Sequence, residues 1–491
     1  MKTTSNEHEP ARKGNFFQLF LRNLRQQAKD RDIRHLCEQL LSQRGEASQT
    51  ALASELISAC EALDEEKRLE FFQMLSSDFG PQLEPIRKAA EKYTGAPGTA
   101  TYEALVAAIE SPRQKLFQRM NTAPRGTETL VAMRGDIGRR LKEHPELQAL
   151  DVDLKVLFTH WFNRGFLRLE RIGWHTPASV LEKLIRYESV HEINGWPDLR
   201  RRLAPDRRCF AFFHPALNDE PVIFIEIALT QGIAGHLGPL LDLNAPVLDS
   251  AAADTAIFYS ISNCLNGLRG ISFGNFLVKQ VVMELQAELP NIKLFSTLSP
   301  MPRFASSLRD QQNPLGFTRE RLARLLADYS SELVKKSGKA DLGEALQLLL
   351  QNPLLHRDTL ARPLQRLALA YFTKARFKGR VIDPVANFHL ANGARLEAIN
   401  LFGNERPYGL TQSCGLMVNY RYVLDEVEDN HERFVREGEV AVAKRLQAQQ
   451  KTIESLWDEP QPKVRTAAKA EVKTEAKAEV KAAEPLLAAR S

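Results

Sequence analysis

The stretch TAIFYSISNCLNGLRGISFGNFLVKQVVMELQAELPNIKLFSTLSPMP, residues 255–302, decides the fold of this chain. It opens with an apolar run rich in β-formers, AIFYSIS (256–262), and continues into a loop with glycines at 267, 270 and 274. Apolar residues then recur at helical spacing over 275–289, up to Pro290. A second apolar run, IKLF (292–295), follows. The stretch therefore predicts a strand, a glycine-rich loop, a helix and a second strand.

The loop RGISFG, residues 269–274, suits a phosphate or pyrophosphate group. The first turn of a helix has amide N–H groups without internal partners and a partial positive charge. Glycines just before such a helix let the backbone approach an anion closely. The spacing matches neither a P-loop nor G-x-G-x-x-G. It is close to the R/Q-x-x-G-x-G/A loop that binds the pyrophosphate of coenzyme A in acetyltransferase-like folds, although the glycines fall differently. A strand-to-helix turn without a ligand is the alternative interpretation.

Length and composition limit the classes of protein that the chain can represent. At 491 residues it predicts two or three domains, and a hydrophobic fraction of 43% supports packed cores. The 66 basic and 61 acidic residues give a net charge of +5, and no folded block is basic enough to indicate a nucleic-acid partner. Five scattered cysteines without C-x-x-C spacing favour a reducing compartment and indicate neither a zinc site nor disulfides.

The ends of the chain and its hydropathy predict a cytoplasmic protein. The first ten residues, MKTTSNEHEP, are polar and carry acids, unlike a signal or transit peptide. The last three residues, ARS, are not a peroxisomal address. No apolar run reaches about 18 residues, so we expect no membrane partner.

The N-terminal third is expected to be helical. We expect residues 1–14 to be disordered and residues 15–165 to form an all-helical bundle, since apolar residues recur at helical spacing between breaks at glycine and proline. Nothing in this stretch clusters nucleophiles, acids or metal ligands. A packing or oligomerisation domain is therefore the favoured interpretation.

Residues 166–456 are expected to form a mixed α/β domain with a helical insertion, which makes the whole chain α+β. The segments 166–172, 207–213 and 221–229 have the pattern of strands, and the last two predict an antiparallel hairpin. Residues 305–379 return to helical periodicity, 409–423 predicts a glycine-led strand, and a charged helix follows to about Leu456. Residues 457–491 are rich in Lys, Glu and Ala, which indicates a disordered tail.

Two side chains stand out as candidates for chemistry. Ser299 lies in LSPMP (298–302), and His389 lies in NFHLANG (387–393), each among small and turn-forming residues. The chain has no G-x-S-x-G, no H-E-x-x-H and no acidic cluster with metal spacing. A buried structural histidine and a Ser-Pro turn are the alternative interpretations of the pair.

Five segments together resemble the malonyl-CoA decarboxylase family: residues 214–228, 266–279, 295–302, 387–394 and 413–422. They occur in the family's order and span about residues 166–425. The resemblance implies a helical assembly domain, with a tetramer as the expected oligomer, and an acetyltransferase-like (GNAT-related) catalytic domain.

The resemblance also implies roles for residues of the site. Ser299 and His389 correspond to the catalytic serine and histidine, and Tyr422 matches a tyrosine near the active site. The acyl-CoA loop corresponds to Arg269, Gly270, Ile271, Ser272, Phe273, Gly274 and Asn275. Some members carry an acid where this chain has Ser272, so that side chain receives no role.

The chemistry of the implied reaction agrees with these residue types. Loss of CO2 from malonyl-CoA leaves an enolate stabilised by the thioester, so no metal or organic cofactor is required. The site needs donors for the enolate oxygen and an acid for the new carbanion. His389 is the expected proton donor, and Ser299 either holds the malonyl carboxylate or accepts a proton. An acyl-CoA-dependent N-acyltransferase and a non-catalytic acyl-CoA sensor remain as alternatives.

Overall fold

The computed structural model describes residues 32–42, 45–271, 277–313, 315–377 and 379–457, which form two compact units. The first unit comprises the described residues up to Pro302 together with Pro384–Val442. The second comprises Arg303–Asp383 and the described residues from Ala443 onward. The domain boundaries expected from the sequence, 15–165 and 166–456, stay predictions. The expected disordered segments lie outside the described residues, except for Trp457.

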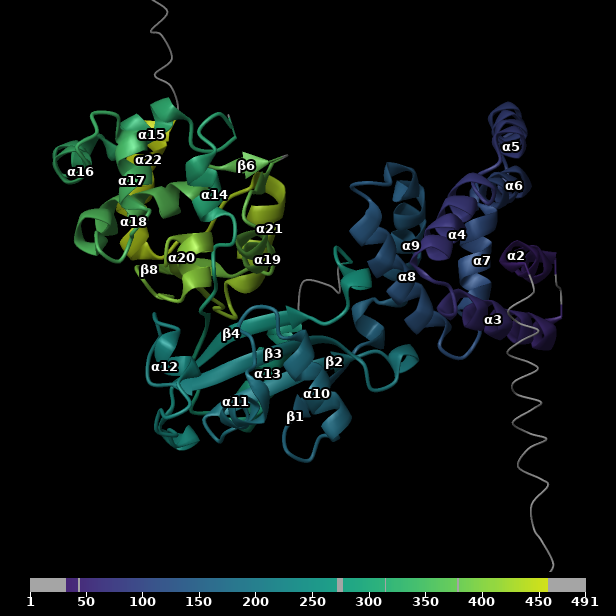
Figure 1. Ribbon diagram of the computed structural model, residues 1–491, viewed down its shortest axis with the longest axis horizontal. Helices are drawn as coiled ribbons and strands as arrows, with labels where there is room; N and C mark the ends of the chain where they lie inside the picture. Colours follow the sequence, from purple (N-terminus) through teal and green to yellow (C-terminus); the bar gives the residue numbers. More distant parts are fainter. Residues whose placement is uncertain (1–31, 43–44, 272–276, 314, 378, 458–491) are drawn as a thin grey trace, which may run out of the picture. The chain divides into compact units, whose positions relative to one another are not determined.

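The first unit begins with helices, as the sequence predicts (Figure 1). Side chains cap several of them; for example, Asp64 accepts a hydrogen bond from the N–H of Lys67, and Ser111 accepts one from Gln114. Their apolar faces form a core that includes Leu56, Phe72 and Phe117. The helices are α2 (Ile33–Ser42), α3 (Glu46–Glu61), α4 (Glu65–Ser77), α5 (Leu83–Gly95), α6 (Thr99–Ile109), α7 (Pro112–Met120), α8 (Gly126–Arg140) and α9 (Gln148–Trp161).

A seven-stranded mixed sheet follows in the same unit, in the order β1-β2-β3-β4-β5-β9-β8. The predicted hairpin is confirmed, because β2 and β3 pair antiparallel with Arg207 opposite Ala228. The predicted strand-helix-strand is confirmed too, since β4 and β5 pair in parallel and α13 (Leu277–Glu288) connects them. The strands are β1 (Arg168–Ile172), β2 (Arg207–Phe213), β3 (Pro221–Thr230), β4 (Thr255–Asn263), β5 (Leu294–Thr297), β8 (Arg395–Asn400) and β9 (Met417–Arg421).

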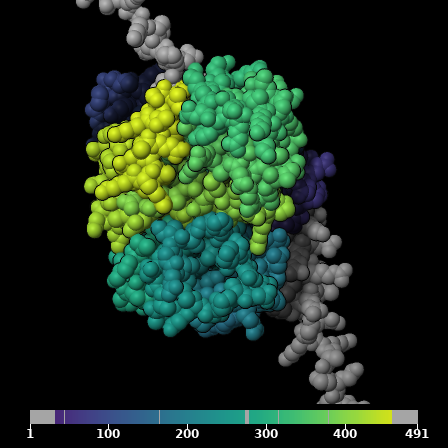
Figure 2. All heavy atoms as spheres, turned by 90° about the vertical axis from the view of Figure 1, so that its left-hand side faces the viewer, coloured from purple at the N-terminus to yellow at the C-terminus, as the bar shows by residue number. Residues whose placement is uncertain are grey.

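Helices cover the sheet, so that β2 is buried along its whole length. Alternate residues of a strand point to opposite faces. Cys209, Ala211 and Phe213 share a core with α10 (Ala178–Tyr187) and α11 (Gly195–Arg202). Arg208 alternates with these residues along β2 and pairs with Glu288 of α13. The segment from β1 to β5 forms one closely packed body, teal in Figure 2. The short helix α12 (Gly238–Leu241) adds to a second apolar cluster.

Two predictions after the insertion need correction. The glycine-led strand expected over 409–423 begins as helix α20 (Pro407–Ser413), and only β9 is extended. Gly409, which led the predicted strand, lies inside α20, and the positive φ of Cys414 and Gly415 ends that helix before β9. The single charged helix expected to Leu456 is two helices, α21 (Val427–Glu437) and α22 (Lys444–Trp457), and Gly438 caps the first at φ +69°.

The second unit is the helical insertion that the sequence predicts, joined by α22. Trp457, expected in the tail, is the last residue of α22 and packs edge-on against Phe317. Figure 2 shows yellow α22 beside the green helices. Within the described residues, no helix is long and apolar enough to cross a membrane. The other elements are α14 (Phe304–Arg309), α15 (Arg319–Leu326), α16 (Ser330–Ser337), α17 (Leu342–Leu349), α18 (Arg357–Thr373) and the ribbon β6 (Arg376–Phe377) with β7 (Arg380–Val381); α19 (Pro384–Ala391) returns to the first unit.

Candidate active site

The sheet itself holds Ser299 in place. Just beyond β5, the N–H of Ser299 donates to the carbonyl of Val418 at 2.8 Å, and the N–H of Val418 donates back to Ser299 at 2.8 Å. Ser299 and Thr297 lie two positions apart in extended chain and therefore share a face. The Ser299 hydroxyl donates to Thr297 Oγ1 at 2.9 Å. The backbone position of Ser299 is thus fixed on both sides, and its hydroxyl is oriented by a neighbour.

The fold brings His389 to this serine, although 90 positions separate them. His389 lies in the last turn of α19, and its Nε2 is 3.2 Å from Ser299 Oγ. The other ring nitrogen, Nδ1, is 2.8 Å from the hydroxyl of Tyr422. The ring of Tyr420 stacks on the imidazole with centroids 4.7 Å apart. Both nitrogens therefore have a partner, and one face of the ring is held.

Burial keeps this group of side chains neutral. Ser299, His389 and Tyr422 are 6%, 3% and 4% exposed. Desolvation lowers the pKa of His389 to about 3, and it raises the pKa of Tyr422 above its ordinary range. At neutral pH the imidazole is uncharged and the phenol keeps its proton. Because Ser299 donates to Thr297, the consistent arrangement has Nε2–H donating to Ser299 and Tyr422 donating to Nδ1.

A cavity of about 370 Å³ opens next to the pair. Its wall includes Ser299 and His389, and Arg269 is the charged side chain that lines it with them. Most of the remaining wall is apolar, with Ile223, Ile225, Phe258, Leu277, Val278 and Phe388 among the lining residues. The volume falls in the range of pockets that hold small molecules, and the polar lining residues besides Ser299, His389 and Arg269 are Tyr259, Ser260 and Asn263.

The structure describes some, but not all, of the residues of the expected acyl-CoA loop. Arg269 is exposed at the cavity, Gly270 has φ +76°, and Ile271 is buried. Ser272, Phe273, Gly274 and Asn275 lie outside the described residues. Of the residues expected in the site, Ser299, His389 and Tyr422 form one hydrogen-bonded chain, and Arg269 shares their cavity.

Sequence reasoning missed two contributors, Thr297 and Tyr420. Thr297 accepts the hydrogen bond of Ser299, and Tyr420 covers the imidazole ring. The sequence does contain a signal for both, because residues two positions apart in extended chain lie on the same face. Thr297 precedes Ser299 by two positions, and Tyr420 precedes Tyr422 by two. Among the described residues, no group of three or more His, Cys, Asp or Glu side chains could hold a metal ion.

The fold and the site together place the chain in an α+β class in which a buried serine–histidine pair lines a cavity of small-molecule size. Comparison with known families agrees with this class and narrows it. The model of the malonyl-CoA decarboxylase C-terminal domain matches residues 165–461, and that of the N-terminal domain of the same family matches residues 79–162.

Proteins named malonyl-CoA decarboxylase are similar to this chain over most of their lengths. A malonyl-CoA decarboxylase structure from Rhodopseudomonas palustris has a TM-score of 0.76 at 46% identity, over 85% of this chain and 98% of that one. The corresponding structure from Agrobacterium vitis has a TM-score of 0.75 at 44% identity, over 86% of this chain and 100% of that one. The mitochondrial malonyl-CoA decarboxylase of Anser anser anser is 35% identical over 74% of this chain and 76% of its own.

The chain belongs to the malonyl-CoA decarboxylase family, and its enzymatic activity is the decarboxylation of malonyl-CoA. The matches favour this activity over both alternatives that the sequence left open, the N-acyltransferase and the acyl-CoA sensor. The cytoplasmic location stays a prediction.

Proposed function

We propose that the enzyme releases CO2 from malonyl-CoA through a thioester enolate, with His389 as proton donor and Ser299 as the group that positions the malonyl carboxylate and accepts a hydrogen bond from His389. The observation that supports these roles is the buried chain from Thr297 through Ser299 and His389 to Tyr422. Each hydroxyl or nitrogen in that chain has its neighbour within 3.2 Å.

The proton balance explains why a neutral histidine suits this reaction. When the bond between C2 and the carboxylate carbon breaks, CO2 leaves and its electron pair moves onto the thioester as an enolate. C2 then takes up one proton, so each turnover consumes a proton from solvent. In the empty cavity burial disfavours imidazolium, but the malonyl carboxylate adds a negative charge that favours it. His389 thus takes up its proton together with the substrate and passes that proton to C2.

The apolar wall of the cavity also favours the decarboxylation step. Excluding water strengthens the interactions of charged groups inside the site and protects the enolate from competing reactions. Apolar side chains from β3, β4, α13 and α19 supply most of the wall beside the pair. The Ser299 hydroxyl can turn from Thr297 to a bound carboxylate at the cost of one neutral hydrogen bond, about 1 kcal/mol.

The loop from Arg269 to Asn275 is the proposed binding site for the pyrophosphate of coenzyme A. Arg269 lies at the cavity and carries a positive charge, and Gly270 has a backbone conformation that side chains disfavour. Helix α13 is described from Leu277, directly after the loop in the sequence, and the amide groups and positive dipole of a helix N-terminus favour an anion.

The catalytic domain is proposed to be related to the acetyltransferase (GNAT) fold. Three antiparallel strands, β2 to β4, lead into the parallel pair β4 and β5, and α13 connects the pair. The cavity is lined by the ends of both parallel strands, at Asn263 of β4 and at Ser299 just beyond β5. An acyl-CoA placed at that edge would reach both the loop and the acid–base pair.

The helical part of the first unit is proposed to join copies of the chain, with a tetramer as the expected assembly. No residue of α6 is buried, although its sequence, TATYEALVAAI, is strongly apolar. Tyr102, Val106 and Ile109 lie at helical spacing on it and are 50–55% exposed, and Leu83 of α5 is 82% exposed. An apolar stripe of this kind fits burial against another copy.

Product analysis in D2O tests the chemical proposal. Malonyl-CoA whose C2 hydrogens have not exchanged should give CO2 and acetyl-CoA with one deuterium in the methyl group, because the enolate takes up one solvent-derived proton. Ser299→Ala and His389→Asn should slow product formation with little change in acetyl-CoA binding. Full activity in either variant would overturn the assigned roles. Release of free coenzyme A only when an amine is added would instead show acyl transfer.

A further inference from the structure

Helix α8 contacts the substrate loop just before the residues proposed to bind coenzyme A. The contact joins the middle of α8 to the short 3-10 turn Asn266–Leu268 and to the Arg269 backbone. It lies wholly within the first unit. Helical residues more than a hundred positions away in the sequence therefore meet the loop at the point where it approaches the cavity.

One arginine makes the polar part of this contact. Arg134, only 7% exposed, donates from one terminal nitrogen to the carbonyl of Gly267 at 2.6 Å and to the carbonyl of Arg269 at 3.0 Å. Its Nε forms an ion pair with Asp151 of α9 at 2.9 Å. The ion pair neutralises the guanidinium and fixes its plane, so that the two loop carbonyls meet a donor with a set position.

Close packing of two glycines makes the second part of the contact between α8 and the loop. A Cβ built on Gly267 would lie 1.8 Å from the carbonyl oxygen of Val131, and one on Gly135 would lie 3.2 Å from the N–H nitrogen of Gly267. The two backbones thus touch without intervening side chains. The loop cannot move toward α8, and Arg134 resists its movement away.

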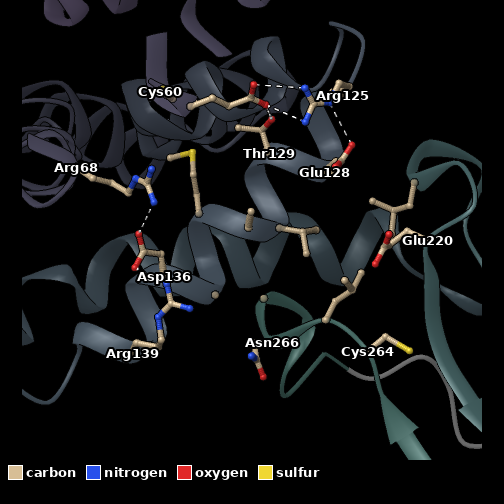
Figure 3. A pocket seen from close by; sticks show the side chains of 18 of the residues that line it. Cys60, Arg68, Arg125, Glu128, Thr129, Asp136, Arg139, Glu220, Cys264 and Asn266 are labelled. Carbon is tan, nitrogen blue, oxygen red and sulfur yellow. Dashed lines mark hydrogen bonds and ion pairs between the residues drawn. The ribbon is translucent and has the colours of Figure 1, made fainter. Parts of the chain in front are cut away.

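A cavity of about 620 Å³ lies beside this contact. Figure 3 shows it with Thr129, Asp136 and Arg139 on the helical side and Cys264 and Asn266 on the side of the loop. Its acidic and basic side chains largely pair with one another, as Arg139 does with Asp136. The cavity borders Asn266 and Gly267, so one flank of the loop faces open space next to the contact with Arg134 and the two glycines.

We propose that Arg134 is a positioning residue for acyl-CoA binding: by holding the carbonyls of Gly267 and Arg269, it sets the direction in which the Arg269 side chain meets the substrate. The proposal rests on the assignment of this loop as the coenzyme A site. The Arg134 side chain does not line the cavity of the acid–base pair, so its loss should change binding and leave the chemical step alone.

The test compares KM and kcat for malonyl-CoA in full-length variants. In Arg134→Met both carbonyl hydrogen bonds are lost, and KM should rise about tenfold, with acetyl-CoA Kd from calorimetry rising in parallel. The kcat should stay within about twofold of wild type. Arg134→Lys keeps the charge but not the planar fork, so it should recover part of the affinity.

Arg113 provides a matched control for a purely structural effect. It is 4% exposed on α7 and pairs with Asp153, on the same helix as the partner of Arg134, and its side chain also donates to the carbonyl of Ser76 in α4. Arg113→Met should lower the melting temperature without moving KM. An equal rise of KM in both arginine variants would overturn the proposal, as would an unchanged KM in folded Arg134→Lys if Arg134→Met fails to fold.

Arg269→Ala separates this inference from the assignment on which it rests. If Arg269→Ala raises KM and the Arg134 variants do not, the loop binds coenzyme A and Arg134 has no positioning role. If Arg269→Ala leaves KM unchanged, the assignment of the loop itself fails. A rise of KM in both, with kcat retained in the Arg134 variants, is the expected result.

Discussion

Replacing His389 with asparagine separates the chemistry of the site from its contribution to folding. Asparagine keeps some hydrogen bonding at this position but cannot take up or release a proton in the working pH range. Loss of a positioned acid typically slows a reaction by about 10²–10⁴, which corresponds to about 2.7–5.5 kcal/mol of transition-state stabilisation. We expect kcat to fall by that factor, while the Kd for acetyl-CoA stays near the wild-type value because the substitution leaves the proposed coenzyme A loop unchanged.

The same substitution has a pH-dependent effect on stability. His389 has a pKa of about 3 in the folded enzyme and an ordinary value near 6.5 when unfolded. Between these values the unfolded chain binds a proton that the folded chain does not, so stability falls as the pH drops below 6.5. The loss is about 1.4 kcal/mol per pH unit. The His389 contribution is fully present above pH 6.5 and declines toward pH 3.

The variant should therefore be less stable than wild type at pH 7.5 but approach it in acid. At pH 7.5 the broken contacts to Ser299 and Tyr422 should cost about 1–3 kcal/mol. At pH 5 wild type should have lost about 2 kcal/mol through His389 alone, and the variant should not show this loss. His191, whose pKa burial also lowers to about 3, is present in both proteins and cancels in the difference.

The assay is steady-state acetyl-CoA formation together with urea unfolding at pH 7.5 and pH 5. A fully active His389→Asn would refute the assignment of the proton donor. A stability difference that stays constant between the two pH values would refute the neutral state of His389 in the folded enzyme.

Three further predictions concern other parts of the chain. Ser299→Ala should lower kcat more than it changes KM in steady-state kinetics. The kcat of the double mutant with His389→Asn should fall by less than the product of the two single-mutant factors. Gly270→Val should raise the KM for malonyl-CoA in a folded protein, because Gly270 has φ +76° and a branched side chain disfavours that backbone; an unchanged KM would contradict a role in binding. Replacing Val106 and Ile109 with lysine should reduce the assembly size in light scattering without lowering the melting temperature of the monomeric unit, and an unchanged size would argue against α6 as the interface.

The strands and most helices could be predicted from the sequence because local pattern and burial agree there. Strand β3 reads PVIFIEIALT and is buried along nearly all of its length. The prediction failed over 409–423, where the glycines suggested the start of a strand. Positive φ at Gly415 ends a helix there, and the local pattern of the sequence does not distinguish these two uses of a glycine.

Less of the candidate site than of the fold could be predicted from the sequence. Composition and spacing drew attention to Ser299 and His389 individually, and the resemblance to a family paired them and added Tyr422. Their distances depend on the pairing of β5 with β9, which is long-range information. Arg134 gave no signal, because a lone arginine in an amphipathic helix normally indicates a solvent-exposed face. Only the folded chain shows that it reaches two loop carbonyls.

The pairing of Ser299 with Val418 has a consequence for how the enzyme is made. On the ribosome, Ser299 is synthesised before the whole helical insertion, whereas His389, Val418 and Tyr422 follow it. A nascent chain can fold the hairpin of β2 and β3 early, yet the proposed catalytic chain cannot form before β9 emerges and docks beside β5. Fragments that stop within the insertion would lack the histidine and the tyrosine altogether. Under the proposed roles, catalysis therefore requires β9 in place, and translation products that end before β9 are expected not to consume malonyl-CoA.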